Sequence, residues 1–233
     1  LILLIGVCLE TNLYSQDSDT LRLYFAHLKV SGGTKQLQKR YDAKTLKYDR
    51  FISTDAQELN YALLSNGFLA FSREDTKAND TLYVKINCGS RYFWSSLELT
   101  EESETVFREA GVNVNRFRSE SISPFRIESS LEKGLKYLEN NGFPFAKFEF
   151  DSLSFDSNKV SGKLTLEKSR LVRIDSVVVI GDLKLRESYL TNFLNIKEGS
   201  LYSERAIQKT PKKLEAIRFL RQIKTPIVTF QDD

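Results

Sequence analysis

The feature that most constrains this chain is a short motif that recurs at an almost constant spacing. A leucine is followed four residues later by Gly-Phe in Leu63–Phe68 and again in Leu138–Phe143. A third copy, Leu214–Phe219, has Arg218 in place of the glycine, and the two intervals between the leucines differ by a single position. A glycine after a helix can adopt the left-handed conformation that ends it, and the phenylalanine then enters the next strand. We therefore predict three units built on one plan.

The early strands of the predicted units align as well. Tyr92–Leu99 matches Val172–Val179 at an interval slightly longer than that of the leucines, and Leu21–Val30 is the corresponding strand of the first unit. Units of about 72 residues are a sensible size for small domains. We expect the domains to span residues 20–89, 90–168 and 169–233, the third being truncated.

The second unit has the clearest secondary-structure pattern. Ile127, Leu131, Leu135 and Leu138 repeat at helical spacing, and the predicted strand 146–150 alternates apolar with charged residues. Turn-forming residues at 156–158 lead into a second alternating strand at 160–166. The polar stretch 111–123 carries no clear pattern, and its conformation stays open.

The third unit begins with an apolar, β-branched run, Leu171–Ile180, which predicts a buried strand closed by Gly181-Asp182. A short helix over 186–194 follows, and Ser203 is a candidate N-cap for a second helix that runs towards Arg221. Pro211 lies inside this helix, so either the helix is kinked or a new one begins at Thr210-Pro211. Ile227–Phe230 then predicts the start of a strand.

Three stretches carry a family resemblance: the strand ending in "IGD", the link "LNIKEGSLYS", and "KKLEAIRFL" leading into a strand. Their order of strand, helix, helix and strand resembles the POTRA domain, the polypeptide-transport-associated module, whose pattern is β-α-α-β-β. The resemblance implies an α+β fold class, with three tandem POTRA-like domains over residues 20–233.

The N-terminal residues 1–16 are predicted to be a partial signal peptide. Leu1–Leu9 is an apolar run of nine residues, too short for a bilayer span of about 20 but suited to the core of a signal. Ser15–Asp17 is a plausible cleavage region. The alternatives are a buried N-terminal strand and a lipoprotein signal at Cys8, which the preceding Val7 disfavours.

No catalytic pattern is apparent in the sequence. His27 is the only histidine and lies on a predicted strand face, and we find no metal-ligand spacing, nucleophile elbow or phosphate-binding loop. The net charge of +3 is too small to indicate nucleic-acid binding. We therefore expect a protein that is not an enzyme and has no cofactor, no metal and no nucleic-acid partner.

The resemblance implies the periplasmic arm of an outer-membrane protein assembly factor (BamA/TamA-like). In that family such domains precede a membrane β-barrel, which this sequence does not contain. The implied location is the periplasmic side of the outer membrane, with unfolded outer-membrane protein clients and accessory assembly proteins as partners. An exposed edge strand can pair with an extended client by β-augmentation. The expected pairing residues are Ala146, Lys147, Phe148, Glu149, Phe150, Ile227, Val228, Thr229 and Phe230.

Two alternatives to this function remain open: the periplasmic arm of a two-partner secretion porin, and a structural docking or division-complex protein with POTRA-like modules. A separate feature is the basic last helix, in which four residues could face anionic lipid headgroups. The other interpretation is an ordinary solvated helix face. The four residues are Arg205, Lys209, Lys212 and Lys213.

Overall fold

The computed structural model describes residues 25–119, 121–180, 187–217, 224 and 226–230. The predicted signal peptide and Leu21–Tyr24 lie outside these residues, as do Gly181-Asp182 and the third motif's Arg218 and Phe219.

The first sheet has four strands in the order β2-β1-β4-β3. β1 pairs in parallel with β4, from Phe25 opposite Thr81 to Ser31 opposite Asn87, and the two outer pairings are antiparallel. The elements in chain order are β1 (Phe25–Ser31), α1 (Lys35–Tyr41), β2 (Lys44–Lys47), α2 (Tyr48–Arg50), the π-helical turn η1 (Phe51–Asp55), α3 (Ala56–Ser65), β3 (Ser72–Ala78) and β4 (Thr81–Asn87).

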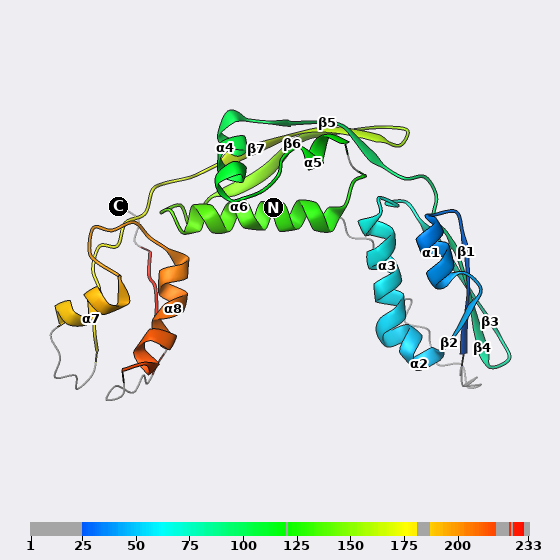
Figure 1. The fold of residues 1–233 in the computed structure, drawn as a ribbon, viewed down its shortest axis with the longest axis horizontal. Coiled ribbons are helices and arrows are strands. Elements are labelled where there is room, and N and C mark those ends of the chain that lie inside the picture. The colour runs from blue at the N-terminus through cyan, green and yellow to red at the C-terminus, as the bar shows by residue number, and fades with distance from the viewer. Residues whose placement is uncertain (1–24, 120, 181–186, 218–223, 225, 231–233) are drawn as a thin grey trace. The chain divides into compact units, whose positions relative to one another are not determined.

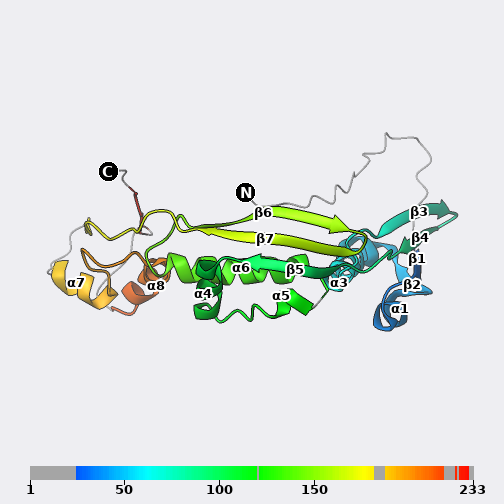
Figure 2. The same ribbon diagram turned by 90° about the horizontal axis from the view of Figure 1, so that it is seen from above.

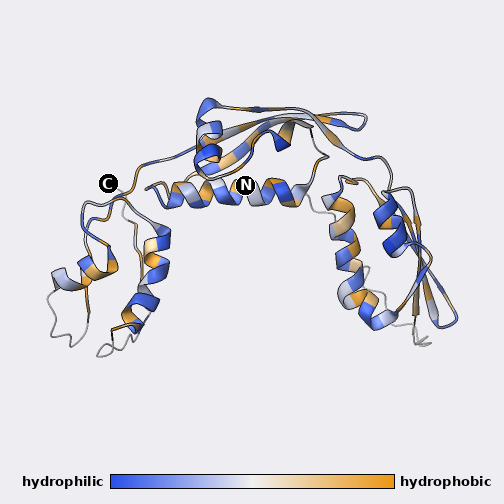
Figure 3. Ribbon diagram, in the orientation of Figure 1, coloured by the Kyte–Doolittle hydropathy of each residue, from blue (hydrophilic) through white to orange (hydrophobic). Residues whose placement is uncertain are grey.

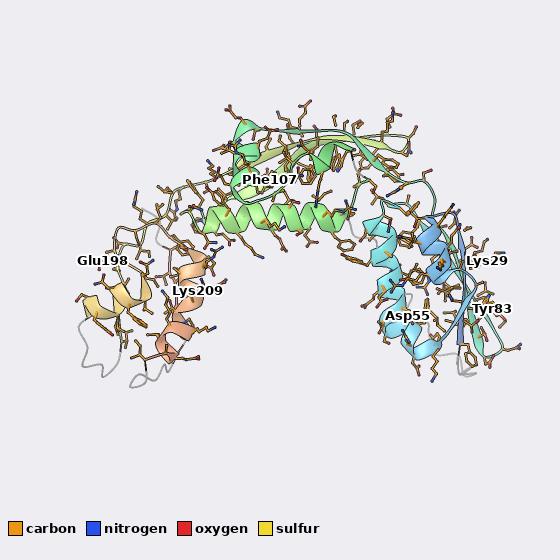
Figure 4. All side chains as sticks on the ribbon, viewed as in Figure 1. Lys29, Asp55, Tyr83, Phe107, Glu198 and Lys209 are labelled. Atoms are coloured by element: carbon orange, nitrogen blue, oxygen red, sulfur yellow. The ribbon has the colours of Figure 1, made fainter. Side chains whose placement is uncertain are left out.

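The core of the first sheet lies on one face because its strands alternate. Ala26, Leu28 and Val30 of β1 are buried, as are the alternate residues of β4. α1 and α3 cover this face and contribute Leu63, which is fully buried (Figure 1). Tyr83 lies on the side that faces away from these helices (Figure 4).

The second sheet has three strands in the order β5-β7-β6, with β7 between the other two (Figure 2). Ser157, in the predicted turn between β6 and β7, has a φ of +55°. The stretch 111–123, for which the sequence predicted no conformation, contains the short helix α5. The elements are β5 (Phe93–Leu99), α4 (Glu101–Glu109), α5 (Arg116–Ser119), α6 (Pro124–Glu139), β6 (Lys147–Asp156) and β7 (Lys159–Glu167).

The α+β fold class is confirmed. With the short helices α2 and α5 and the turn η1 set aside, both sheets follow the order β-α-α-β-β, and the first sheet adds the short strand β2 between its helices. Trp94, the only tryptophan of the chain, is 8% exposed in β5, as expected of a core residue.

Close packing of aromatic rings joins α4, α6 and β6. The rings of Phe107 and Phe148 are stacked with their centroids 4.9 Å apart. Gly134 of α6 leaves room for Phe148, because a Cβ at that position would lie 2.8 Å from its ring. Leu138 and Leu164 are buried in the same part of the chain.

The chain divides into two compact units, and the division passes through β5, α6, β6 and β7. One unit comprises 1–97, 115–128 and 152–162, and the other 98–114, 129–151 and 163–233. β7 ends at Glu167, and no strand in the described part of the chain crosses residue 169. The division into three domains stays a prediction.

The prediction of two strands in the third unit, residues 169–233, is wrong. Leu171–Ile180 is irregular apart from one bridge between Arg173 and Leu201, and Ile180 is 94% exposed. Ile227–Phe230 is also irregular. An apolar, β-branched run becomes a strand only beside a partner. β1 and β5 both pair with the last strand of their sheet, and no described residue provides such a strand here.

The helices of this segment are α7 (Glu187–Leu194) and α8 (Glu204–Glu215). Ser203 is the N-cap of α8, as predicted, and its hydroxyl accepts a hydrogen bond from the Ala206 amide. α8 continues through Pro211, so no new helix begins at Thr210-Pro211. The Thr210 hydroxyl instead donates to the Ala206 carbonyl at 3.1 Å.

The repeated glycines end their helices as the sequence predicts. Gly67 has a φ of +88° and Gly142 a φ of +90°. The amides of Phe68 and Phe143 donate back to the carbonyls of Leu63 and Leu138, at 3.1 and 3.0 Å. These bonds satisfy carbonyl groups that a helix end otherwise leaves without a partner.

The same glycines connect each helix to the segment that follows. The Gly67 carbonyl accepts from the Tyr92 amide at 2.8 Å, and the Tyr92 carbonyl accepts from Ile122 at 3.0 Å. In the second copy, the Gly142 carbonyl accepts from the Val172 amide at 2.7 Å, and the Val172 carbonyl accepts from the Tyr202 amide at 3.0 Å. The sequence repeat is therefore also a repeat of hydrogen bonds.

The first of these connections has an additional polar clamp around Arg91. Its Nε donates to the Asn66 carbonyl at 2.6 Å, and its Nη2 donates to the Ser121 hydroxyl at 3.0 Å. Asn158 donates to the Arg91 carbonyl at 3.2 Å. The second connection has Leu171 at the equivalent position, so it lacks this clamp.

Leu138→Ala should lower the free energy of unfolding by about 2–5 kcal/mol, because it removes a side chain that is only 2% exposed and leaves a cavity. Urea titration followed by circular dichroism measures this loss. Leu153→Ala is the control, since Leu153 is 37% exposed and should lose much less. Equal losses in the two variants would contradict the packing of α6.

Gly67→Ala should destabilise the protein more than Gly111→Ala. Both glycines have positive φ, so an alanine is strained at either position. A Cβ at Gly67 would lie 3.0 Å from the Tyr92 carbonyl oxygen, whereas nothing lies within 4 Å at Gly111. We expect overpacking at Gly67 to add about 1–3 kcal/mol to the strain that both variants share. Thermal unfolding of the two variants makes the comparison, and equal losses would contradict the close approach.

Candidate strand-pairing edges and a basic helix face

β6 is an edge strand that contains most of the predicted pairing residues. It is ten residues long and outermost in its sheet, with β7 on one side and no other described strand beside it (Figure 2). Lys147, Phe148, Glu149 and Phe150 lie on it. Ala146 precedes it, and its amide donates to the Phe143 carbonyl at 3.3 Å.

The side chains of β6 alternate between packing and solvent at its start. Phe148 stacks on Phe107, whereas Lys147 and Glu149 are exposed. The Lys147 ammonium lies 3.0 Å from Glu149 and 2.9 Å from Glu167. Hydrogen bonds to Glu167 and Glu149 raise the pKa of Lys147, and the bond to Lys147 lowers the pKa of Glu149. The solvent side of the strand therefore carries a small charge network.

The structure does not place the second predicted pairing segment, Ile227–Phe230, at a sheet edge. Ile227 is 81% exposed and unpaired within the described residues. Phe230 contacts two aromatic rings, with centroid distances of 4.8 Å to Phe145 and 5.5 Å to Tyr202.

β3 is a second edge strand, which the sequence did not indicate as a pairing site. It is outermost in the first sheet and pairs only with β4 among the described strands. Ser72 and Lys147, the first residues of β3 and β6, are separated by the same interval as Leu63 and Leu138. The spacing of the repeat therefore contained the signal, but the charged sequence of β3 lacks the apolar alternation that marked β6.

The four basic residues of α8 differ in exposure and in bonding. Arg205, Lys209 and Lys212 are exposed, and Figure 4 labels Lys209 on this helix. The Lys213 ammonium instead donates to the carbonyl of Leu194 at 2.6 Å, at the C-terminal end of α7. Lys213 is half-buried and has a structural role.

The N-terminus of α8 meets Asn140, the residue directly after α6. The Asn140 side-chain oxygen accepts from the Arg205 amide at 2.8 Å and from the Ser203 hydroxyl at 3.1 Å. The Tyr202 hydroxyl donates to the Glu204 carboxylate. Burial and this bond raise the pKa of Tyr202, and burial together with the charge of Glu204 raises the pKa of Glu139.

Within the described ranges, no group of three or more His, Cys, Asp or Glu side chains could hold a metal ion. None of the helices described is both long and apolar enough to span a bilayer.

Comparison with known families finds a match in the last part of the chain. Residues 172–233 match the POTRA family, described as a surface antigen variable number repeat. We call residues 172–233 the POTRA-matching segment. It contains α7, α8 and the two apolar runs that the sequence predicted as strands. The comparison with curated proteins finds no match.

Three solved structures are similar to the chain. POTRA3-5 of Haemophilus influenzae BamA is 15% identical, with a TM-score of 0.49 and coverage of 89% of this chain and 92% of that one. The N-terminal domain of Omp85 from Thermosynechococcus elongatus is 10% identical, with a TM-score of 0.39 and coverage of 89% and 90%. CdiB from Escherichia coli is 12% identical, with a TM-score of 0.29 and coverage of 66% and 29%.

Glu139→Gln should stabilise the protein at neutral pH. A carboxyl whose pKa is raised on folding contributes stability below its unfolded pKa, about 4.3, and loses that contribution as the pH rises through the folded pKa. Above the folded pKa the ionised Glu139 is therefore unfavourable, and glutamine removes the charge. Urea unfolding at several pH values should show a gain at neutral pH that disappears below about pH 4. A gain that is independent of pH would contradict this assignment.

Proposed function

We propose that this chain belongs to the periplasmic arm of an outer-membrane β-barrel assembly or translocation protein, and that it binds extended client segments by strand addition. The observation that carries the proposal is the free edge of β6. The POTRA match of residues 172–233 supports the location and the class of client. The partners are then unfolded outer-membrane proteins, accessory assembly proteins and a membrane barrel. The arm binds and does not catalyse.

The chemistry of a strand edge suits a client of varied sequence. Each residue of an edge strand presents backbone groups to one side or the other, and those that face away from the sheet lack a partner in it. Pairing through these groups gives affinity, while side chains contribute only where they meet a pocket. The ten residues of β6 match the length of one barrel strand, which is about 9–11 residues.

The exposed charges of Lys147 and Glu149 fit a transient function. Charged side chains on an edge strand oppose permanent pairing between copies of the same chain. These side chains do not block the backbone groups of the edge, so a client strand in excess can still bind. β3 has the same arrangement, with Glu74 paired to Lys85 at 3.0 Å on its solvent side.

The test is a nuclear magnetic resonance titration of the labelled chain with a peptide of about ten residues that copies one barrel strand. Shifts should concentrate in β6, with a second set in β3. The same peptide with alternate amides N-methylated keeps its side chains but loses donors along one edge. Its affinity should fall on the order of tenfold or more. Equal binding of both peptides would overturn strand addition.

Two sets of variants complete this test. Lys147→Ala and Glu149→Ala should change the affinity little, because pairing uses backbone groups. Phe148→Pro should weaken it strongly, since proline removes a donor and disrupts the strand. Circular dichroism must first show that this variant is folded, because Phe148 packs against Phe107. A large loss in both alanine variants would instead indicate side-chain recognition.

A further inference from the structure

The positive charge of this chain is concentrated in α8 and the residues that follow it. Residues 204–224 contain seven Lys or Arg and two Glu, a net charge of +5, whereas the whole chain has a net charge of +3. The rest of the chain therefore has a net charge of −2. Such an asymmetry indicates an anionic partner for one part of the molecule.

α8 arranges three of these cations along one side. Arg205, Lys209 and Lys212 follow one another at intervals of four and three residues, which places them on one helix face over about 10 Å of its length. Thr210, on the opposite face, is 4% exposed. Figure 3 shows the resulting mixture of hydrophilic and hydrophobic residues along α8. We call the three cations the α8 basic stripe.

The side chains of the stripe are not used within the protein. None of the three forms an ion pair or a side-chain hydrogen bond in the part of the chain that the structure describes. The contrast with Lys213 is informative, because that lysine binds the Leu194 carbonyl. The stripe therefore consists of the cations that α8 does not need for its own packing.

We propose that the α8 basic stripe binds the headgroups of anionic phospholipids at a membrane surface. A line of separate charges on an exposed helix matches a plane of diffuse negative charge. A single bound anion would require donors that converge on one point. The proposal rests on the proposed function, because an arm of an outer-membrane protein works beside a lipid surface. It adds a second contact to the arm, independent of its sheet edges.

The size of the attraction follows from the number of cations. Each basic residue near an anionic surface contributes enough to change the affinity about fivefold, so three together change it on the order of 100-fold. This attraction weakens as salt is added, because the charges are exposed and screened. Binding of this kind is reversible and leaves α8 packed on its own segment.

The test is flotation of the full chain with vesicles of phosphatidylglycerol and phosphatidylcholine, compared with phosphatidylcholine alone. The chain should bind the anionic vesicles at low salt. The triple variant Arg205→Gln, Lys209→Gln, Lys212→Gln should bind on the order of 100-fold more weakly. Lys213→Gln should bind within about twofold of the original chain. Absence of any preference for the anionic vesicles overturns the proposal.

A matched control separates the stripe from net charge. Lys29, Lys44 and Lys47 are exposed on the first sheet, and their replacement by Gln removes the same total charge. This variant should retain binding, and an equal loss in both triple variants overturns the proposal. Polyglutamate that binds the chain more tightly than vesicles at equal charge concentration would assign the stripe to an acidic protein instead.

The strand-peptide titration distinguishes this proposal from the proposed function. The stripe variant should bind the peptide as the original chain does, because β6 and β3 are unchanged. Loss of vesicle binding with intact peptide binding supports both proposals. Vesicle binding that depends on the stripe, in a chain that fails to bind the peptide, retains the stripe and overturns strand addition.

Discussion

The hydrogen bond between a helix-ending glycine carbonyl and the amide of the following segment supports much of this structure. A residue with a left-handed backbone ends the helix and turns its own carbonyl towards the next segment. Gly67 and Gly142 both do so, and each bond is followed by a second bond from the same segment to the residues before the next helix. The repeat is therefore retained in backbone geometry, even where its side chains differ, as at Arg91 and Leu171.

The sequence predicted the features that depend on local chemistry. The helix ends at Gly67 and Gly142, the turn at 156–158 and the N-cap Ser203 depend on residues within a few positions of each other. It failed where a distant partner decides the outcome. Leu171–Ile180 has the composition of a buried strand, but a strand also needs a neighbour that composition cannot supply. Pro211 was ambiguous because a proline can either begin a helix or lie inside one with a lost hydrogen bond, and only the structure shows that α8 continues through it.

The candidate site divides in the same way. The β6 edge could be predicted because alternation marks the strand and the repeat marks its place after the helix. β3 was missed because its exposed, charged sequence has no apolar face to detect, although the interval of the repeat indicates it. The four cations of α8 were visible as a group, but the role of Lys213 was not. Only the position of the Leu194 carbonyl separates a structural lysine from three solvent-facing cations.

The single tryptophan gives the molecule a built-in optical reporter of one region. Trp94 is buried in β5, while the first sheet and the POTRA-matching segment contain only tyrosines and phenylalanines as aromatic fluorophores. Excitation at the red edge of protein absorbance therefore reports on the second sheet alone. A denaturation curve from this signal and one from far-ultraviolet circular dichroism will coincide only if the chain unfolds as a single cooperative unit. Their separation would measure how independently the repeated units lose structure.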